Sequence, residues 1–224
     1  AVTGVRLWQF ERLYLEAPKG LGKTMLFAAL LIESFLGPSR EFSPGSPNIP
    51  VGANSEDQAD DTIWGRVCQI LGDRNCPLRP FVTVFDDRVI YADGSPGLMQ
   101  RVPNNARTVD GGLPTLYVAD EVHDWVGAAT VAHQKIENST TKRTNGRVMS
   151  CSTPGACAGE PSVGWRLHDL GEKIVSGHHD DPHFLYVSHA AKLADYDLED
   201  EQQLERALRA ATPGLTHRRM DRLK

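Results

Sequence analysis

The chain has 224 residues and a formal net charge of −5, from 24 basic and 29 acidic side chains. This length is enough for one large α/β domain or two small ones, and the 40% hydrophobic and 24% charged fractions are ordinary for a soluble globular protein. The acidic balance excludes the overall basic surface of many nucleic-acid binders, although a local patch or a pore built from several subunits can still grip DNA. No run approaches the ~18 apolar residues of a membrane span, so no membrane partner is expected, and the sequence given shows no signal-peptide pattern.

The most informative stretch is a strand, a loop and a helix in succession. Arg12–Glu16 predicts a short buried strand, and residues 25–35 predict a helix. The loop between them fits a phosphate-binding loop at every position except the first, where Ala replaces the usual Gly. The predicted nucleotide-binding residues in this loop are Ala17, Pro18, Lys19, Gly20, Leu21, Gly22, Lys23 and Thr24.

Such a loop binds phosphate because successive backbone N–H groups and the positive end of the following helix dipole point at the anion. In this arrangement Lys23 reaches the β- and γ-phosphates of a nucleotide, and the Thr24 hydroxyl holds Mg²⁺. The alternative is a chance Gly-x-Gly-Lys turn. The flanking strand and helix favour the phosphate-binding loop over that alternative.

Turn signals and hydrophobic periodicity divide the next part of the chain. Residues 37–50 are rich in Pro, Gly and Ser and predict a surface loop, and residues 49–53 predict a strand. A helix is expected to follow as far as residue 71, with Asn54 or Ser55 as its N-cap. One face of that helix carries Ala59, Ile63, Val67 and Ile70.

The rest of the chain alternates predicted strands and helices. Strands are expected at residues 81–85, 88–91, 113–119, 147–152 and 184–187, and the first two form a hairpin around Asp86-Asp87. Residues 94–107 predict a loop or irregular strand. Helices are expected at residues 128–138, 164–175 and 199–211. The alternation predicts an α/β fold with a mainly parallel central sheet covered by helices on both faces.

Asp120 and Glu121 come directly after the apolar strand at 113–119, which is the setting of a Walker B motif. In that setting Asp120 holds the Mg²⁺ shell through water, and Glu121 orients and deprotonates an attacking water. A carboxylate pair at a strand end can also be a solvated turn. The phosphate-binding loop upstream favours the catalytic interpretation.

Ser152 and Thr153 end another buried strand. A hydroxyl at the tip of a neighbouring strand can sense a γ-phosphate and relay its hydrolysis to another part of the protein. These two residues are therefore a candidate coupling motif. The alternative is a turn stabilised by their hydroxyls and closed by Pro154-Gly155.

Cysteine and histidine spacing argues against a structural metal site. Residues 178–183 (HHDDPH) carry metal-ligating side chains, but their Asp-Pro step and dense polarity predict a solvated turn. No C-x-x-C pair occurs among the cysteines, which are predicted to be free thiols in a reducing cytosol. The four are Cys68, Cys76, Cys151 and Cys157.

Five segments occur in a particular order along the chain. They are FERLYLEAPKGLGKT at 10–24, VGANSEDQA at 51–59, LYVADEVHDW at 116–125, MSCSTPG at 149–155 and AATPGL at 210–215. In this order and spacing they resemble the ATPase domain of a tailed-bacteriophage large terminase, and the last resembles the start of its linker. The first two motifs are common to many NTPases, whereas the ordered set is more specific.

The resemblance implies a P-loop NTPase fold of the ASCE/RecA-like type and a motor that uses ATP and Mg²⁺ to move double-stranded DNA into a procapsid. It implies a homo-oligomeric ring on the portal protein, a small terminase subunit as partner, and the host cytoplasm as location. Residues 1–212 correspond to the ATPase domain and 213–224 to the start of a linker. A full-length terminase continues into a nuclease domain that is absent from this sequence, so no DNA cleavage is expected of it.

Three positions depart from the family pattern. Lys19 stands where the family often has Arg, and Lys cannot make the same bidentate phosphate contact. The family's adenine-contacting glutamine usually lies farther upstream than Gln9, which is the candidate here; the alternative is that the true contact precedes the sequence given. The arginine that acts on a neighbour's site corresponds to Arg107, with Arg101 in reserve; each can also be an ordinary surface arginine.

Two other classes of protein remain possible from the sequence. Asp120-Glu121-Val122-His123 spells a DExH box, as in one lobe of a superfamily 2 helicase, although a helicase needs two such lobes. A nucleotide-binding scaffold with little turnover has no use for the catalytic base Glu121. His123 is expected to make a structural hydrogen bond beside the acid pair, and the alternative is that it couples the site to DNA. The basic residues 217–222 are expected to end a solvated helix, and the alternative is a contact with DNA or with a nuclease domain.

Overall fold

The computed structural model describes residues 8–39, 46–53, 62–103, 112–155 and 161–212. Its strands are β1 (Arg12–Glu16), β2 (Asn48–Ala53), β3 (Val82–Val84), β4 (Arg88–Tyr91), β5 (Leu98–Pro103), β6 (Leu116–Ala119), β7 (Arg147–Ser152) and β8 (Phe184–Ser188). Its α-helices are α1 (Lys23–Leu36), α2 (Ile63–Gly72), α3 (Ala128–Thr140), α4 (Val163–Val175) and α5 (Glu201–Ala211). Short 3-10 helices are η3 (Arg79–Phe81), η4 (Val122–Asp124) and η5 (Leu193–Asp195).

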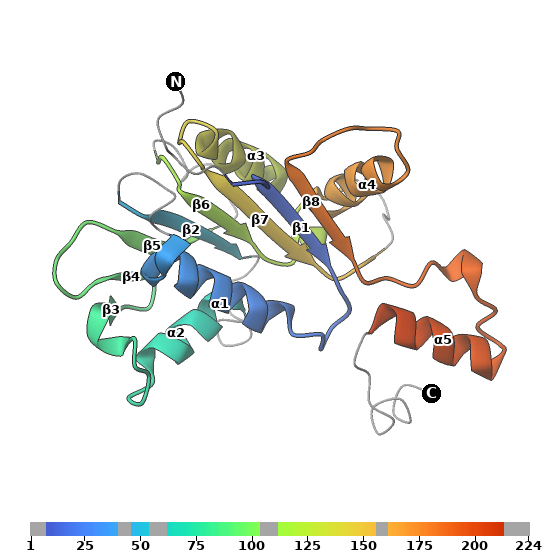
Figure 1. Ribbon diagram of the computed structural model, residues 1–224, viewed down its shortest axis with the longest axis horizontal. Coiled ribbons are helices and arrows are strands. Elements are labelled where there is room, and N and C mark those ends of the chain that lie inside the picture. Colours follow the sequence, from blue (N-terminus) through green and yellow to red (C-terminus); the bar gives the residue numbers. More distant parts are fainter. Residues whose placement is uncertain (1–7, 40–45, 54–61, 104–111, 156–160, 213–224) are drawn as a thin grey trace.

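The strands form one sheet in the order β3-β4-β5-β2-β6-β7-β1-β8 (Figure 1). The strands from β5 to β8 in this order pair in parallel, and β3 and β4 add an antiparallel hairpin at one edge. Strand β7 lies between β6 and β1. Because parallel strands end at the same edge of a sheet, the segments that follow β1, β6 and β7 come together there.

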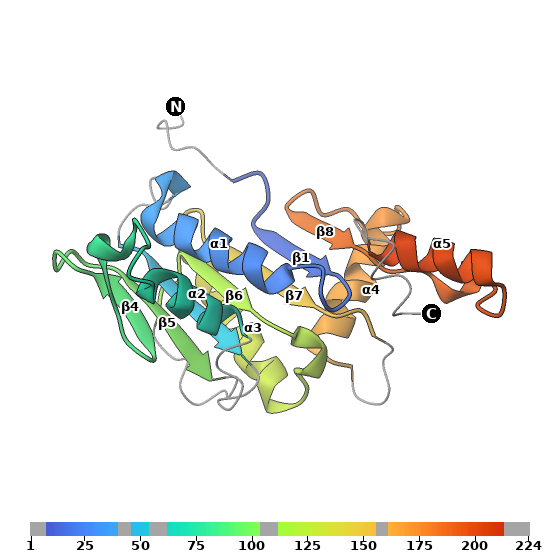
Figure 2. The same ribbon diagram turned by 90° about the horizontal axis from the view of Figure 1, so that it is seen from below.

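Helices cover both faces of the sheet: α1 and α2 lie on one face, and α3 and α4 on the other (Figures 1 and 2). The strands alternate to match, since successive side chains point to opposite faces. In β1, Leu13 and Leu15 join the core on the α1 side, whereas Tyr14 joins the core on the α4 side. The predicted α/β fold class, with a mainly parallel central sheet and helices on both faces, is confirmed.

The start of α2 differs from the prediction. The helix begins at Ile63, and its N-cap is Thr62, whose hydroxyl accepts a hydrogen bond at 3.1 Å from the backbone N–H three residues on. The predicted cap, Asn54 or Ser55, is wrong because Thr62 caps α2; Asn54 and Ser55 themselves lie outside the described residues. The sequence offers several cap-type residues in a row before Ile63, and local propensity does not choose among them.

The buried face of α2 agrees in part with the predicted one. Ile63 and Val67 are buried as predicted, whereas Ile70 is half-buried at the rim of the core. Trp64 and Leu71 complete the buried face, and Ala59 lies outside the described residues.

The predicted hairpin of β3 and β4 is confirmed, but the segment after it is more regular than expected. Within residues 94–107, β5 pairs in parallel with β2 along its whole length, from Leu98 beside Asn48 to Pro103 beside Ala53. Of its side chains only Met99 is buried. A strand with one buried side chain lacks the apolar run that sequence periodicity detects.

The last helix, α5, lies beside the sheet beyond β8 (Figure 1). The side chain of Asp200 caps it by accepting hydrogen bonds from Gln202 N and Gln203 N at 2.9 Å. Within the part of the chain that the structure describes, no helix has both the length and the apolar character needed to cross a membrane.

Gly52 allows β2 to approach the segment that follows β6. A Cβ at this position would lie 2.6 Å from Trp125 Cη2 and 3.0 Å from the hydroxyl oxygen of Tyr117. The carbonyl of Gly52 also accepts a hydrogen bond from Asp120 N at 3.1 Å. The missing side chain therefore helps to fix the position at which β6 ends and the acid pair begins.

We predict that Gly52→Ala lowers the free energy of unfolding by about 1–3 kcal/mol, because the added methyl group overpacks the aromatic contacts. Urea unfolding followed by circular dichroism measures the change. Gly72→Ala is the matched control, since a Cβ at Gly72 meets no atom within 4 Å. That variant should be neutral or more stable by up to about 1 kcal/mol. Equal stability of the two variants would contradict the packing argument.

Candidate nucleotide-binding site

Residues 17–22 form a tight loop between β1 and α1. Gly20 and Gly22 have φ angles of 85° and 89°, a left-handed conformation that glycine adopts without steric cost. Ala17 is fully buried, and its N–H donates to Ser152 O on β7 at 3.1 Å. Of the remaining loop residues, Lys19 is exposed, and Pro18 and Leu21 are half-buried. The loop thus leads its backbone directly into the N-terminus of α1, as a phosphate-binding loop does.

Lys23 is the first residue of α1, and its ammonium group lies over the loop. The residue is only 7% exposed. Its Nζ donates to Ala17 O at 2.5 Å and lies 3.4 Å from both Pro18 O and Thr153 Oγ1. All three partners are neutral, and a buried ammonium is better stabilised by anionic oxygens, such as those of a phosphate.

Asp120 is buried at the end of β6, with 6% of its surface exposed. The Cys151 thiol donates to its Oδ1 at 3.2 Å, and the N–H of Ile63, at the N-terminus of α2, donates to its Oδ2 at 3.2 Å. Burial raises the pKa of Asp120 above its usual value, because removal from water disfavours the charged form, and these two donors offset the shift in part. A divalent cation nearby would stabilise the carboxylate further.

At Glu121, one residue beyond Asp120, the backbone changes direction from β6 into the short helix η4. The backbone of Glu121 has φ 47° and ψ 48°, a left-handed conformation that is uncommon outside glycine and that recurs at functional sites. Its Oε2 accepts a hydrogen bond from Thr153 N at 3.2 Å and lies 3.4 Å from Thr153 Oγ1. The side chain is 36% exposed, so its carboxylate can reach water. A general base needs this combination of anchoring and access.

Ser152 and Thr153, at the tip of β7, link the loop to the acid pair. Ser152 is fully buried, and its carbonyl holds Ala17 of the loop. Thr153 contacts the ammonium of Lys23 through its hydroxyl and the carboxylate of Glu121 through its N–H. The structure therefore brings together the predicted loop, acid pair and coupling motif at one edge of the sheet.

Gln9, the predicted adenine contact, is not brought to this edge. It precedes β1, and its carbonyl lies 3.2 Å from Nδ1 of His183, in the segment before β8. The five-residue strand β1, about 16 Å long, separates this point from the loop. The geometry does not support a contact between Gln9 and a nucleotide held by the loop of the same chain.

Of the two candidate arginines, the structure describes only Arg101, which lies apart from the loop. Arg107 is outside the described residues. Arg101 is near the end of β5, where its N–H donates to Asp87 O at 2.9 Å. Strands β2, β6 and β7 lie between β5 and β1, which corresponds to a separation of about 19 Å. That separation exceeds the length of an arginine side chain, so Arg101 does not reach the loop of its own chain.

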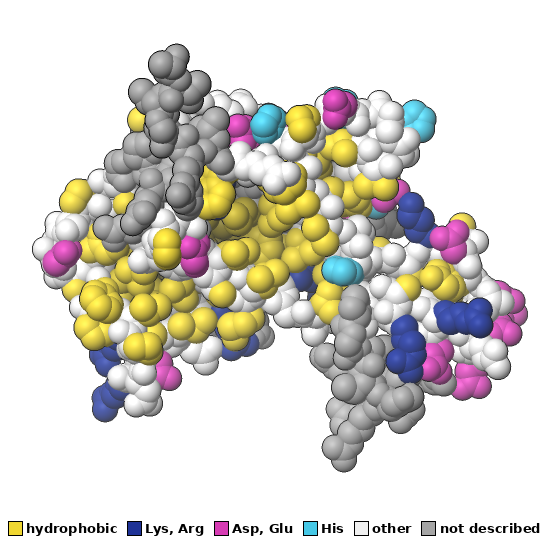
Figure 3. Space-filling view, in the orientation of Figure 1, with side chains coloured by type: hydrophobic (Ala, Val, Ile, Leu, Met, Phe, Trp, Pro, Cys, Tyr) yellow, Lys and Arg dark blue, Asp and Glu magenta, His cyan; other side chains and the backbone are white. Residues whose placement is uncertain are grey.

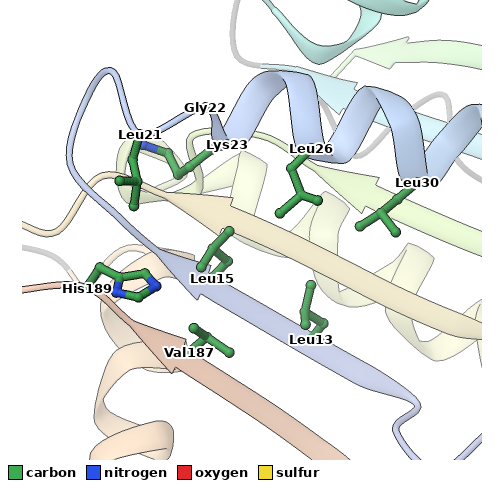
Figure 4. A pocket seen from close by; sticks show the side chains of 9 residues that line it. All are labelled: Leu13, Leu15, Leu21, Gly22, Lys23, Leu26, Leu30, Val187 and His189. Atoms are coloured by element: carbon green, nitrogen blue, oxygen red, sulfur yellow. The ribbon is translucent and has the colours of Figure 1, made fainter. Parts of the chain in front are cut away.

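A cavity of about 410 Å³ opens beside the loop, between α1 and strands β1 and β8 (Figure 4). Lys23 and His189 stand at the end nearest the loop. Apolar side chains gather on this face of the molecule (Figure 3). The apolar wall of the cavity consists of Leu13, Leu15, Leu21, Leu26, Leu30 and Val187. The sequence did not single out this cavity, because its wall combines residues of β1, α1 and β8 that are far apart in the chain.

Glu16, directly before the loop, was also missed by sequence reasoning. It is 4% exposed, and its carboxylate accepts hydrogen bonds from Tyr186 at 2.7 Å and Tyr14 at 3.2 Å, with His168 Nδ1 at 2.8 Å. Burial raises the pKa of both tyrosines, so the hydroxyls remain protonated donors. The contacts tie the end of β1 to β8 and α4. An acidic residue at the end of an apolar strand was the only signal in the sequence.

The part of the chain that the structure describes contains no group of three or more His, Cys, Asp or Glu side chains arranged to hold a metal ion. His178 and His179 are exposed in the turn before β8. Cys68 and Cys76 are half-buried free thiols, and Cys151 is a buried one. Cys157 lies outside the described residues.

No family model matches the sequence, and no curated protein sequence matches it significantly. Solved structures do match. The large terminase of bacteriophage HK97 aligns with a TM-score of 0.73 and 21% identity, over 95% of this chain and 42% of that one. The large terminase ATPase domain of Thermus phage P74-26 aligns with a TM-score of 0.57 and 15% identity, over 94% and 87%. A mutant of that domain aligns with a TM-score of 0.61 and 15% identity, over 82% and 78%.

The fold is therefore the P-loop NTPase fold of phage large terminase ATPase domains, as the order of the sequence motifs predicted. At these identities the likeness establishes the fold, and the activity must be argued from the site itself. The chain spans 42% of the length of the HK97 terminase.

We predict that Lys23→Ala weakens the binding of Mg·ATP by at least about 10-fold, because the charged hydrogen bonds of the ammonium group to phosphate are lost. Isothermal titration calorimetry measures the Kd. Lys173→Ala is the matched control, since Lys173 is an exposed lysine of α4 paired with Asp169. An unchanged Kd in Lys23→Ala would remove the loop from its assigned role.

Proposed function

We propose that this chain is the ATP-hydrolysing motor domain of a viral large terminase, which drives translocation of double-stranded DNA into a procapsid. The observation that carries the proposal is the meeting of loop, acid pair and coupling motif at the ends of three adjacent strands. The fold shared with terminase ATPase domains supports it.

The residues of the site fit ATP and Mg²⁺. The ammonium of Lys23 has only neutral partners, which the oxygens of a triphosphate would replace. Asp120 is a buried carboxylate whose raised pKa a divalent cation would lower. Among the described residues the hydroxyl of Thr24 has no hydrogen-bond partner and is free to bind a metal. We therefore assign Mg²⁺ to Thr24 and Asp120, where it would neutralise charge on the phosphates.

Glu121 is the general base of the proposed reaction. It accepts a proton from a water whose oxygen attacks the γ-phosphorus, while the bond from that phosphorus to the β–γ bridging oxygen breaks. The products are ADP and phosphate, and Lys23 stabilises the charge that develops on their oxygens. Thr153 contacts both Lys23 and Glu121, so loss of the γ-phosphate would change the contacts at the tip of β7.

We propose that the adenine base occupies the cavity beside the loop. The cavity begins at Gly22, Lys23 and His189, beside the loop, and continues along an apolar wall toward Leu13 and Leu30. Its size and its few polar groups suit a planar aromatic ring. This proposal replaces Gln9 as the adenine contact within the chain.

The proposed assembly is a homo-oligomeric ring on the portal protein in the host cytoplasm, with the small terminase subunit and double-stranded DNA as partners. An arginine from the neighbouring subunit, Arg107 or Arg101, completes each site. The distance of Arg101 from its own loop supports a role toward a neighbour. Such an arginine is worth ~10³–10⁵ in rate, so an isolated domain should be slow.

A single lobe of a DExH-type superfamily 2 helicase is the second candidate. It is favoured by His123, the last residue of the DExH sequence, whose ring lies 3.0 Å from the Ser152 hydroxyl at the tip of β7. The two candidates differ in the nucleic acid that stimulates hydrolysis and in the dependence on assembly.

We predict that Glu121→Gln binds ATP as tightly as the wild type and hydrolyses it ~10²–10⁴-fold more slowly, because the amide cannot accept the proton. A phosphate-release assay measures the rate, and calorimetry the Kd. Asp169→Asn, on the exposed face of α4, makes the same chemical change away from the site and should hydrolyse normally. Near-wild-type turnover in Glu121→Gln would rule out its role as base.

We predict that ATP turnover per subunit rises with protein concentration and is stimulated by double-stranded DNA, because a neighbour completes each site. The rate is measured over a range of concentrations, with and without double- and single-stranded DNA. Turnover per subunit that stays constant and responds mainly to single strands would favour the helicase instead.

A further inference from the structure

His123, on η4 just after the acid pair, contacts three polar side chains. Its Nδ1 lies 3.1 Å from Glu121 Oε2 and 3.0 Å from Ser152 Oγ. Its Nε2 lies 3.3 Å from Asp124 Oδ1. A ring protonated at Nδ1 donates to Glu121, and an imidazolium donates to both carboxylates.

The contacts of the Glu121 carboxylate converge on one of its two oxygens. Oε2 receives Thr153 N at 3.2 Å, lies 3.4 Å from the Thr153 hydroxyl and 3.1 Å from the His123 ring. No contact to Oε1 occurs among the described residues. One oxygen of the carboxylate is thus anchored from two sides, and the other remains free to take a proton from water.

The backbone of His123 is itself fixed from two directions. Its N–H donates to the hydroxyl of Ser152 at 3.1 Å, which ties η4 to β7. On the other side, a Cβ at Gly164 of α4 would lie 2.9 Å from His123 N and 3.0 Å from His123 Cα. Because Gly164 has no side chain, α4 packs directly against the backbone of His123. The position of the His123 Cα, from which the imidazole ring extends, is therefore fixed.

We propose that His123 is a positioning residue that holds the Glu121 carboxylate in the orientation of a general base. The proposal rests on the proposed ATP hydrolysis. The hydrogen bond from Thr153 N fixes the position of Oε2 but lets the Glu121 carboxylate rotate about the line of that hydrogen bond. The contact with the His123 ring removes this rotation. Because His123 acts through Glu121 and touches none of the loop residues, its loss should slow hydrolysis without weakening nucleotide binding.

The test compares His123→Ala with His123→Asn. We expect His123→Ala to lower kcat by about 10- to 100-fold, the cost of a misplaced catalytic group, with the Kd for ATP unchanged. Asn carries an N–H donor at nearly the position of imidazole Nδ1, so His123→Asn should recover at least a third of the lost rate on a logarithmic scale. His178→Ala, which removes an exposed histidine from the turn before β8, is the matched control.

A double-mutant cycle adds a second readout. If His123 and Ser152 act as one unit on Glu121, then Ser152→Ala combined with His123→Ala should slow hydrolysis by less than the product of the two single effects. Thermal unfolding of each variant separates loss of the fold from loss of orientation.

Wild-type kcat in His123→Ala would overturn the proposal. The proposal would also be overturned if both variants had a normal melting temperature and His123→Asn recovered none of the lost kcat. In that case the N–H donor at this position would not matter for hydrolysis. A loss of ATP affinity in His123→Ala would also contradict the proposal. Absence of hydrolysis in the assembled wild type would instead refute the proposed function, so the two failures are distinguishable.

Discussion

Two hydrogen bonds from the tip of β7 hold the candidate site together. On one side, Ser152 O accepts the N–H of Ala17, and on the other, Thr153 N donates to the carboxylate of Glu121. Because β7 lies between β1 and β6, this tip sets the separation between the loop and the acid pair. A shift of the tip relative to either neighbour changes the distance between Lys23 and Glu121, and with it the geometry available for hydrolysis.

The same edge concentrates buried charge. Lys23, Asp120 and Glu16 are each less than 10% exposed, and charges that leave water are stable only when hydrogen-bonded or paired. Glu16 is satisfied by two tyrosines and a histidine, whereas the donors to Asp120 are a weak thiol and backbone N–H groups. Burial of the apolar cores on both faces of the sheet stabilises the fold and offsets the cost of burying these charges at the edge. The incompletely paired charges are the ones assigned to phosphate and metal.

Local motifs made the loop and the acid pair predictable, because each lies within a few residues and next to an apolar strand. The contact of His123 with Ser152 and the close approach of Gly164 depend on packing between segments far apart in the sequence. The α2 cap was wrong because several adjacent residues suit a cap equally well. Gln9 is a different case, because its position depends on where the chain enters β1: its carbonyl lies beside His183, at the amino end of that strand.

The most direct test of the central claim is a crystal structure of the chain with Mg²⁺, ADP and aluminium fluoride, which mimics the transferring phosphoryl group. The account predicts that Lys23 Nζ leaves Ala17 O for the fluoride, and that the Glu121 carboxylate faces the fluoride with Oε2 still on Thr153 N. An analogue bound elsewhere, with Lys23 still on Ala17 O, would contradict the assignment of this edge as an ATP site.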